Sequence, residues 1–149
     1  MAIGERIHHF RLQRGFTQKY LGQQLGFSDS QADVRIAQYE KGARSPKDKY
    51  LNAMADIFEV SPHALAVPDI DSYVGLMHTL FTLEDLYGLH IDEIDGELCL
   101  RLDKAKGTTY LSMFDMFHAW QEQAEKLKSG EITQEEYDQW RYNYPKNAK

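Results

Sequence analysis

Hydrophobic positions in the first 65 residues recur at the three- and four-residue spacing of short amphipathic helices. Ile3, Ile7 and Phe10 mark a first helix near the N-terminus. Thr17 has the side chain and the position of an N-cap for a second helix, which Gly26 ends. The chain is therefore expected to begin with two short helices joined by a tight turn.

Capping signals predict three further helices in the same region. Asp29 or Ser30 is expected to cap a third helix that runs to Glu40. Ser45-Pro46 predicts the start of a fourth helix, and Ser61-Pro62 repeats that signal for a short fifth. No residues in this region have the alternation of a strand, so five compact helices are predicted.

The period of the hydrophobic pattern changes after residue 88. A longer helix is predicted over 73–87, and alternating apolar and polar residues then flank Asp95-Gly96, a pair suited to a type I′ turn. This turn predicts an apolar face made by the pairs Ile91–Leu100 and Leu89–Leu102. The opposite face is polar and holds His90, Asp92, Cys99 and Arg101. Helices are therefore expected to cover only one side of the hairpin.

Two more helices are predicted after the hairpin, which makes the second half α-β-β-α-α. A long amphipathic helix spans Tyr110 to Leu127, and Thr133 with Glu136 forms a capping box for the last helix. The aromatic residues of this half are expected to be mostly core, with some available for a ligand pocket or a dimer seam. They are Tyr110, Phe114, Phe117, Trp120, Tyr137, Trp140, Tyr142 and Tyr144.

Charge distinguishes the two halves. Val67-Pro68-Asp69 is the expected boundary between a domain at 1–67 and an acidic α+β domain at 68–149. The whole chain has a net charge of −6. Residues 1–67 hold nine Lys/Arg against seven Asp/Glu, a net of +2, and 68–149 hold eight against sixteen, a net of −8. Phosphate binding depends on local charge, so the first domain is the one suited to nucleic acid.

Composition and motifs argue against several other classes of protein. No apolar run approaches the roughly 18–20 residues of a membrane span, so no membrane partner is expected. Cys99 is the only cysteine, which excludes an internal disulfide and fits the cytoplasm. No catalytic triad, phosphate loop or dinucleotide motif is present, so no enzyme activity and no cofactor are expected. Asp115, His118 and Glu122 have a metal-ligand spacing, but the polar side of an amphipathic helix accounts for them, and no metal site is predicted.

An ordered set of short motifs over residues 3–65 resembles the helix-turn-helix domain of the Cro/phage-repressor (XRE) family. The stretches that carry the resemblance are Ile3-Gly4-Glu5-Arg6-Ile7, Arg14-Gly15-Phe16-Thr17-Gln18, Leu25-Gly26-Phe27-Ser28, Tyr39-Glu40-Lys41-Gly42, Arg44-Ser45-Pro46 and Val60-Ser61. The resemblance implies a mainly α protein with a lambda-repressor-like five-helix domain. It also implies that the third helix enters the major groove of double-stranded DNA.

The sequence departs from the family before the third helix. Family members place about six positions between the turn glycine and the helix-3 isoleucine, whereas Gly26 and Ile36 are ten apart. The roughly four extra residues lengthen either the turn or the start of helix 3.

Helical geometry divides the third helix into two faces. The inward stripe is Ala32, Ile36 and Tyr39. The outward face holds Gln31, Val34, Gln38 and Lys41, with Arg35 at its flank. Gln can make two hydrogen bonds to adenine, Arg can do so with guanine, and a Val methyl can pack on thymine. These residues are the predicted base readers, although a polar outward face can also simply be solvated.

Other residues are expected to contact the DNA backbone. By the resemblance, Gln18 matches the phosphate-clamping glutamine of the family. Lys41 and Arg44, in the turn after the third helix, are placed for backbone phosphates.

These observations predict a sequence-specific transcriptional regulator, a repressor in preference to an activator. The resemblance implies binding to a palindromic operator as a homodimer, and the second domain is the candidate for dimerisation or for a small-molecule, peptide or protein effector. An alternative from another class is an antitoxin-like module whose acidic half binds a basic protein.

Overall fold

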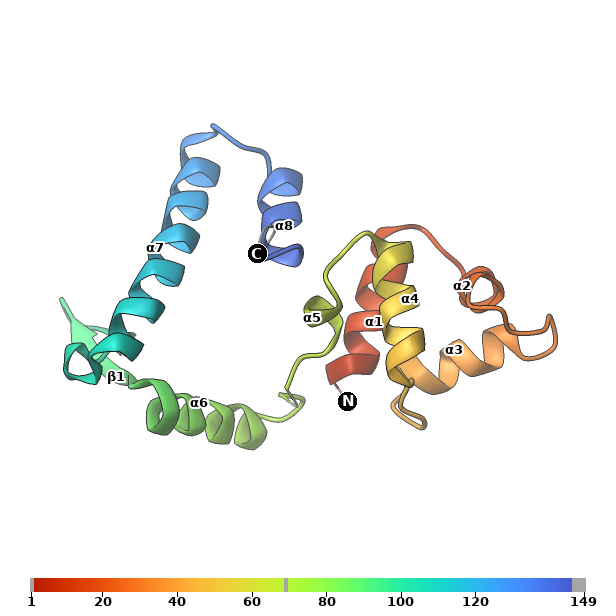
Figure 1. Cartoon of the computed structure of the whole chain (residues 1–149), viewed down its shortest axis with the longest axis horizontal. Helices are drawn as coiled ribbons and strands as arrows, with labels where there is room; N and C mark the ends of the chain where they lie inside the picture. The colour runs from red at the N-terminus through yellow and green to blue at the C-terminus, as the bar shows by residue number, and fades with distance from the viewer. Residues whose placement is uncertain (1, 69, 146–149) are drawn as a thin grey trace. The chain divides into compact units, whose positions relative to one another are not determined.

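A computed structural model describes residues 2–68 and 70–145 (Figure 1). Asp69, at the expected boundary, and residues 146–149 lie outside the described residues. The described residues form eight α-helices, a short 3-10 helix and one two-stranded antiparallel sheet. The predicted mainly α fold class is confirmed.

The first five helices follow the predicted order. They are α1 (Ala2–Gln13), α2 (Gln18–Gln24), α3 (Ala32–Glu40), α4 (Asp48–Phe58) and α5 (Pro62–Leu65). Thr17 caps α2, since its Oγ1 accepts a hydrogen bond from the backbone nitrogen of Tyr20 at 3.0 Å. Ser61 caps α5 in the same way, through the backbone nitrogen of His63 at 3.2 Å.

The predicted cap of α3 was wrong. The helix begins at Ala32, and Gln31 stands at its N-cap without a side-chain capping bond. Asp29 and Ser30 both precede the cap position, and Asp29 Oδ1 accepts a hydrogen bond from Gln23 Nε2 at 2.8 Å. The carboxylate is thus directed back to α2.

The predicted start of α4 at Ser45-Pro46 was also wrong. Lys47 is the N-cap and has an extended backbone, with ψ 157°. Its carbonyl oxygen accepts the first backbone bonds of the helix, from Tyr50 at 2.8 Å and Leu51 at 3.1 Å. The residues between Gly42 and Lys47 form a connecting segment, not a helical turn.

The five helices enclose one hydrophobic core. Its buried members come from every helix and from the segment after α4, and are Ile7, Phe10, Leu21, Ile36, Tyr39, Met54, Ala55, Phe58, Val60 and Leu65. Seven large side chains in this core are completely buried, which gives the domain an interior of its own.

The end of the chain returns to this core. Contacts group the described residues up to Asp71 with residues 139–145 as one compact unit. The Tyr142 ring meets Phe10 edge-on, with ring centroids 4.9 Å apart, and the backbone nitrogen of Ser61 donates to the Tyr142 carbonyl oxygen at 2.9 Å. Local patterning along the chain contained no signal for this long-range contact.

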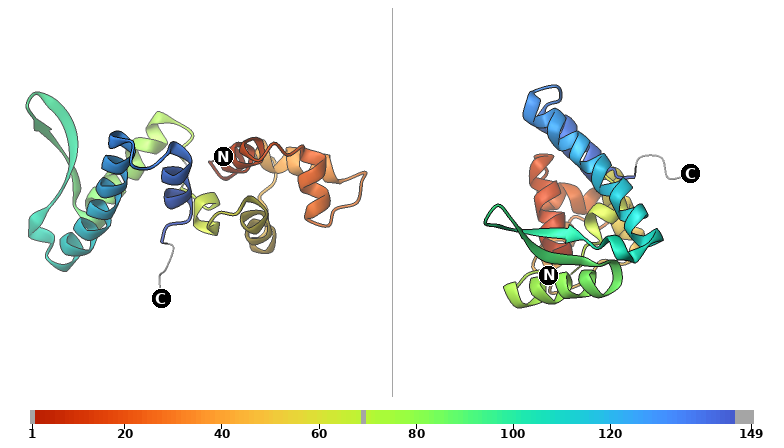
Figure 2. Two further views of the ribbon diagram at one scale, coloured as in Figure 1. Left: turned by 90° about the horizontal axis from the view of Figure 1, so that it is seen from above. Right: turned by 90° about the vertical axis from the view of Figure 1, so that its left-hand side faces the viewer.

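The second compact unit, residues 72–138, has the predicted α-β-β-α-α order. Its elements are α6 (Tyr73–Tyr87), β1 (Leu89–Ile94), β2 (Glu97–Leu102), a 3-10 helix at Lys104–Lys106, α7 (Thr108–Ser129) and the start of α8 (Gln134–Tyr142). The turn of the hairpin stands clear of α6 and α7 in both views of Figure 2.

The hairpin has the predicted register. Leu89 pairs with Leu102, and Ile91 pairs with Leu100. The turn residues Asp95 and Gly96 have φ values of 52° and 83°, as a type I′ turn requires. The capping box of α8 is present as well, because Thr133 and Glu136 exchange hydrogen bonds of 2.8 and 3.2 Å.

The expectation that the aromatic residues of the second half are mostly core was wrong. Between residues 72 and 138, all of which are described, Gly88 is the one buried residue. Phe114 and Trp120 remain 46% and 50% exposed. Too few elements of the second unit surround these side chains to remove them from water.

Candidate nucleic-acid interface

Two glycines let α3 approach its neighbours closely. A Cβ on Gly22 of α2 would lie 2.3 Å from the carbonyl oxygen of Ala32, at the start of α3. A Cβ on Gly4 of α1 would lie 2.5 Å from the carbonyl oxygen of Glu40, at its end. Real Cβ atoms do not approach backbone so closely, so glycine at both positions permits the observed placement of α3.

The extra residues before α3 lengthen the turn and not the helix. The carbonyl oxygen of Ser28 accepts backbone hydrogen bonds from Gln31 and Ala32, both at 2.9 Å. These bonds close a loop that leads directly into the first residue of α3. The inward stripe of Ala32, Ile36 and Tyr39 is accordingly buried as predicted.

The opposite face of α3 is open to solvent. Gln31 and Lys41 are exposed, Val34 is 47% exposed, and Gln38 is half-buried. Ala37 lies between Val34 and Gln38 on the same face, which the sequence analysis did not single out, although its helical position could have shown it. The face presents amide groups, two small apolar side chains and one ammonium group.

A buried ion pair holds the end of α3 against α1. The side chains of Arg11 and Glu40 are only 8% and 7% exposed. Nη2 of Arg11 donates to Oε2 of Glu40 at 3.1 Å, and the Arg11 Nε donates to Oε1. Nδ1 of His8 lies 3.0 Å from the same Oε2. Burial raises the pKa of the Glu40 carboxyl, but the hydrogen bonds from Arg11, Gln18 and His8 outweigh it and leave that pKa below its ordinary value.

Gln18 belongs to the same cluster. Its Nε2 donates to Oε2 of Glu40 at 2.8 Å, which orients the side chain at the first residue of α2. An amide nitrogen carries two protons, so one remains for a second acceptor. The Glu40 carboxylate thereby holds the Gln18 side chain in place at the start of α2.

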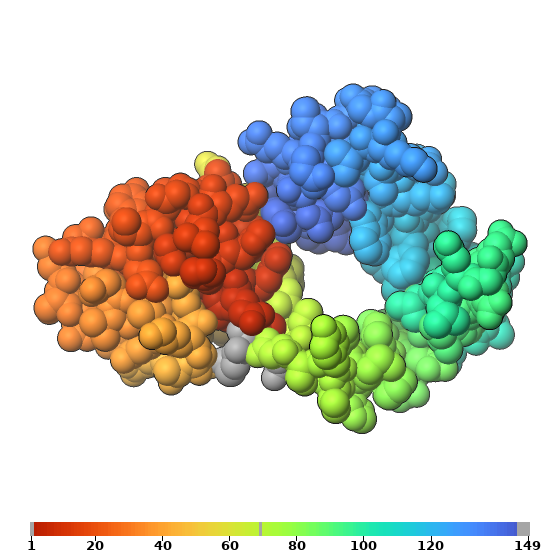
Figure 3. All heavy atoms as spheres, turned by 180° about the vertical axis from the view of Figure 1, so that it is seen from behind, coloured from red at the N-terminus to blue at the C-terminus, as the bar shows by residue number. Residues whose placement is uncertain are grey.

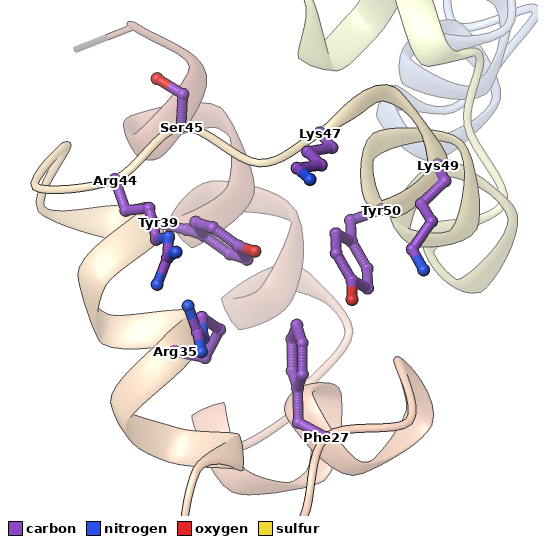
Figure 4. A pocket seen from close by; sticks show the side chains of 8 residues that line it. All are labelled: Phe27, Arg35, Tyr39, Arg44, Ser45, Lys47, Lys49 and Tyr50. Atoms are coloured by element: carbon purple, nitrogen blue, oxygen red, sulfur yellow. The ribbon is translucent and has the colours of Figure 1, made fainter.

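A basic pocket lies beside α3 (Figure 4). Its volume is about 220 Å³, and its charged lining consists of Arg35, Arg44, Lys47 and Lys49, with no acidic residue. The side chains of Phe27, Tyr39 and Tyr50 form its aromatic walls. Lys47 and Lys49 were missed by the sequence analysis, because their position at the mouth of this pocket depends on where α4 begins.

Arg35 points into this pocket and not outward with Gln38. Its guanidinium carbon lies 5.6 Å from the centre of the Phe27 ring, a cation–π distance. Its Nε is buried without a hydrogen-bond partner among the described residues. Figure 4 shows the side chains of Arg35 and Arg44 directed toward the same space. Two guanidinium groups in one pocket without a carboxylate can bind an anion such as a phosphate.

The predicted site residues therefore fall into two neighbouring sets. One set forms the outward face of α3 and comprises Gln31, Val34, Gln38 and Lys41. The other borders the basic pocket and comprises Arg35 and Arg44. Gln18 stands apart from both, at the start of α2 in the Glu40 cluster.

Comparison with known proteins identifies the class of domain that residues 2–67 form. Residues 2–67 match the family model described as a helix-turn-helix domain. Residues 2–67 are therefore a helix-turn-helix domain, the class of fold in which a second, recognition helix enters the major groove of DNA. Helices α2 and α3 both lie within the matched residues.

The remaining comparisons are sparse. The crystal structure of the transcriptional regulator BswR is similar, with 23% sequence identity and a TM-score of 0.43 over 57% of this chain and 95% of that chain. No curated protein matches the chain.

No described helix is long and apolar enough to cross a membrane. Nowhere in 2–68 or 70–145 do three or more His, Cys, Asp or Glu side chains gather as a metal site would require.

Proposed function

We propose that the chain is a sequence-specific DNA-binding transcriptional regulator that reads bases with α3. The observation that carries this proposal is the outward face of α3 within a helix-turn-helix domain. Gln31 and Gln38 supply the paired donors and acceptors that recognise adenine, and Val34 supplies methyl groups that pack on thymine. Ala37 is small enough to let the helix backbone approach the groove.

Phosphate binding is assigned to the residues around this face. Gln18, held by Glu40, donates its remaining amide proton to one phosphate. Lys41 provides positive charge at the end of the outward face, and Arg44, Lys47 and Lys49 provide it at the basic pocket, which has no acidic residue. Such contacts position a protein on the duplex without reading its sequence.

The operator is proposed to be palindromic and bound by a homodimer. A single small helix-turn-helix domain buries too little DNA surface for tight specific binding at physiological salt. Two copies place two recognition helices about 34 Å apart, one turn of DNA, and so read two half-sites. We assign the protein as a repressor, which acts when its operator overlaps a promoter.

The test is fluorescence anisotropy of the full chain with duplexes tiled from the DNA upstream of its own gene. Wild type is expected to bind one palindromic tile at least a hundredfold more tightly than scrambled DNA at near-physiological salt. Gln38→Ala is expected to weaken binding to this tile by about 1–3 kcal/mol and to leave binding to scrambled DNA unchanged. Gln134→Ala, which removes an exposed amide from α8, is the matched control and should change neither.

Three results would count against parts of this proposal. Equal binding of all tiles would remove sequence specificity. Equal loss on specific and scrambled DNA in Gln38→Ala would make Gln38 a phosphate contact. A promoter–reporter fusion that gains expression when the protein is supplied would replace repression with activation.

A further inference from the structure

The second unit lacks the interior that the helix-turn-helix domain has. In the first unit seven large side chains are fully buried, whereas between residues 72 and 138 no residue except Gly88 is buried. Fourteen large hydrophobic side chains in this range are between 40% and 90% exposed. The side chains of α6 and of the hairpin lie at the surface in the space-filling view (Figure 3).

The second unit exposes enough apolar side-chain area for an interface. Five of the exposed side chains are aromatic. At roughly 150–250 Å² for each whole aromatic side chain, they leave on the order of 500 Å² uncovered. The largest apolar patch of a typical monomer is about 300–600 Å² in total, and here nine aliphatic side chains add to the aromatic area.

The hairpin shows most clearly that apolar side chains of the second unit are uncovered. Its apolar face contains Ile91, Leu98 and Leu100, which are 61%, 76% and 46% exposed. Glu93 is the one charged residue on that face. A two-stranded hairpin is at best marginally stable in water unless further strands or helices cover it. The face therefore needs an apolar cover, and a charged partner would leave most of it in water.

The groove beside this face is too small for most ligands. It lies between β2 and α7 and has a volume of about 240 Å³. Its apolar lining is Leu100, Leu102, Tyr110, Phe114 and Phe117, and its polar lining is Arg101, Lys104, His118 and Gln121. Small-molecule sites are usually about 300–1,000 Å³. The groove has the size of a gap that one or two apolar side chains would fill.

We infer that the apolar face of the hairpin, with the adjoining surfaces of α6 and α7, is the interface for a second copy of this chain. A second copy supplies the same apolar face and the same groove, so each unit completes the core of the other in an isologous contact. A standard interface buries about 800 Å² on each partner, which the exposed apolar side chains of this unit can provide. The inference deepens the proposed function, because it names the surface that joins two DNA-binding domains.

The charge of the chain argues for this occupant over a basic protein. The net charge of −8 in residues 68–149 would attract a basic partner to the acidic side chains. Those acidic side chains lie mainly outside the apolar face of the hairpin. Glu93 is the one charged residue on that face. A partner held by charge would therefore leave Ile91, Leu98 and Leu100 uncovered.

The test is the molar mass of the full chain in the absence of DNA, measured by sedimentation equilibrium from micromolar to tens of micromolar. Wild type is expected at twice the chain mass of 17.3 kDa. Leu98→Lys places a charge at the most exposed apolar position of the hairpin and is expected to give the 17.3 kDa monomer. Glu97→Lys changes the neighbouring residue on the opposite face of β2 and is expected to stay dimeric.

A second measurement distinguishes loss of the interface from loss of folding in Leu98→Lys. Hydrogen exchange is expected to protect the amides of α6, the hairpin and α7 more strongly in wild type than in Leu98→Lys, while the amides of α1 to α4 are protected equally in both. A wild-type monomer at all concentrations overturns the inference, and so does equal protection of α6, the hairpin and α7 in wild type and in Leu98→Lys. A dimer that persists in both Leu98→Lys and Ile91→Lys also overturns it.

The DNA measurements separate this inference from the proposed function. A dimer that binds no operator leaves the interface in place and removes the regulator. A monomer that binds a half-site specifically supports the regulator and removes the interface. Co-purification with a basic protein that dissociates in high salt, with a 17.3 kDa chain left behind, would identify charge as the recognition mode and contradict the apolar interface.

Discussion

Nε2 of Gln18 and Oε2 of Glu40 lie 2.8 Å apart, a hydrogen bond that joins the first residue of α2 to the last residue of α3. The same carboxylate is paired with Arg11 of α1. One buried acidic group thus ties together three helices and orients the amide assigned to a DNA phosphate. Gln18 therefore makes a structural contact with Glu40 and is also the residue proposed to contact a DNA phosphate.

Replacing the buried carboxylate should destabilise the helix-turn-helix domain. Glu40→Gln leaves the Arg11 guanidinium buried without its charge partner, and removal of one member of such a pair costs about 3–5 kcal/mol. Chemical denaturation of the full chain measures the free energy of unfolding. Asp92→Asn is the matched control, because the Asp92–Arg101 pair is exposed and its loss should cost little. Equal effects of the two variants would show that the Glu40 pair is not buried in solution.

The Glu40 cluster should also make stability depend on pH. The pKa of Glu40 is lower in the folded chain than its ordinary value of 4.5. The ionised carboxylate therefore stabilises the fold at neutral pH, and this contribution is lost as the pH falls below 4.5 through the folded-state pKa. Denaturation curves of wild type and Glu40→Gln should converge in acid. A constant difference between them from pH 7 to pH 3 would contradict this assignment.

A methyl group at Gly22 should displace α3. Gly22→Ala puts its Cβ against the backbone of Ala32, where no flexible side chain can move aside. The expected cost is about 3 kcal/mol, the upper end of overpacking effects, together with weaker operator binding. Gly15→Ala is the control: its added Cβ meets nothing within 4 Å, but its φ of +69° costs about 1–2 kcal/mol. Unchanged operator affinity in Gly22→Ala would show that α3 tolerates the shift.

The lysines at the basic pocket should contribute affinity without specificity. Lys47→Ala and Lys49→Ala are each expected to weaken operator and scrambled DNA alike and to reduce the slope of log affinity against log salt by about 1. Anisotropy titrations over a range of salt concentrations measure this slope. Lys128→Ala removes a lysine from α7 and should leave the slope unchanged. A loss confined to the operator would instead make these lysines base-reading residues.

The returning C-terminal segment should stabilise the first unit. Tyr142 packs edge-on against Phe10, and the carbon of the Arg6 guanidinium lies 5.4 Å from the centre of its ring. Tyr142→Ala is expected to cost about 2–3 kcal/mol, less than the 3–5 of a fully buried aromatic side chain. Tyr144→Ala, which removes an exposed ring close to Trp140, should cost under 1 kcal/mol by denaturation, as surface substitutions usually do. Similar costs would mean that Tyr142 does not rest on Phe10 in solution.

Short-range chemistry explains how much of the fold was predictable. Thr17, Ser61 and the Thr133–Glu136 pair cap helices with partners two or three residues away, and Asp95-Gly96 sets the hairpin register through its own backbone angles. The inward stripe of α3 follows from helical spacing. Each signal acts within a few residues, so the amino-acid sequence by itself determined these elements and the faces of α3.

Contacts between distant residues decided the rest. Asp29 lies before the cap position and binds Gln23 of α2, and Arg35 is directed into the basic pocket that Phe27 and Tyr39 line. The Arg11–Glu40 pair and the Phe10–Tyr142 contact join residues far apart in the chain. Sequence patterns mark a side chain as apolar but not what covers it. Only the tertiary structure could therefore separate the buried core of residues 2–65 from the uncovered apolar faces of residues 72–138, since burial depends on how many elements surround a side chain.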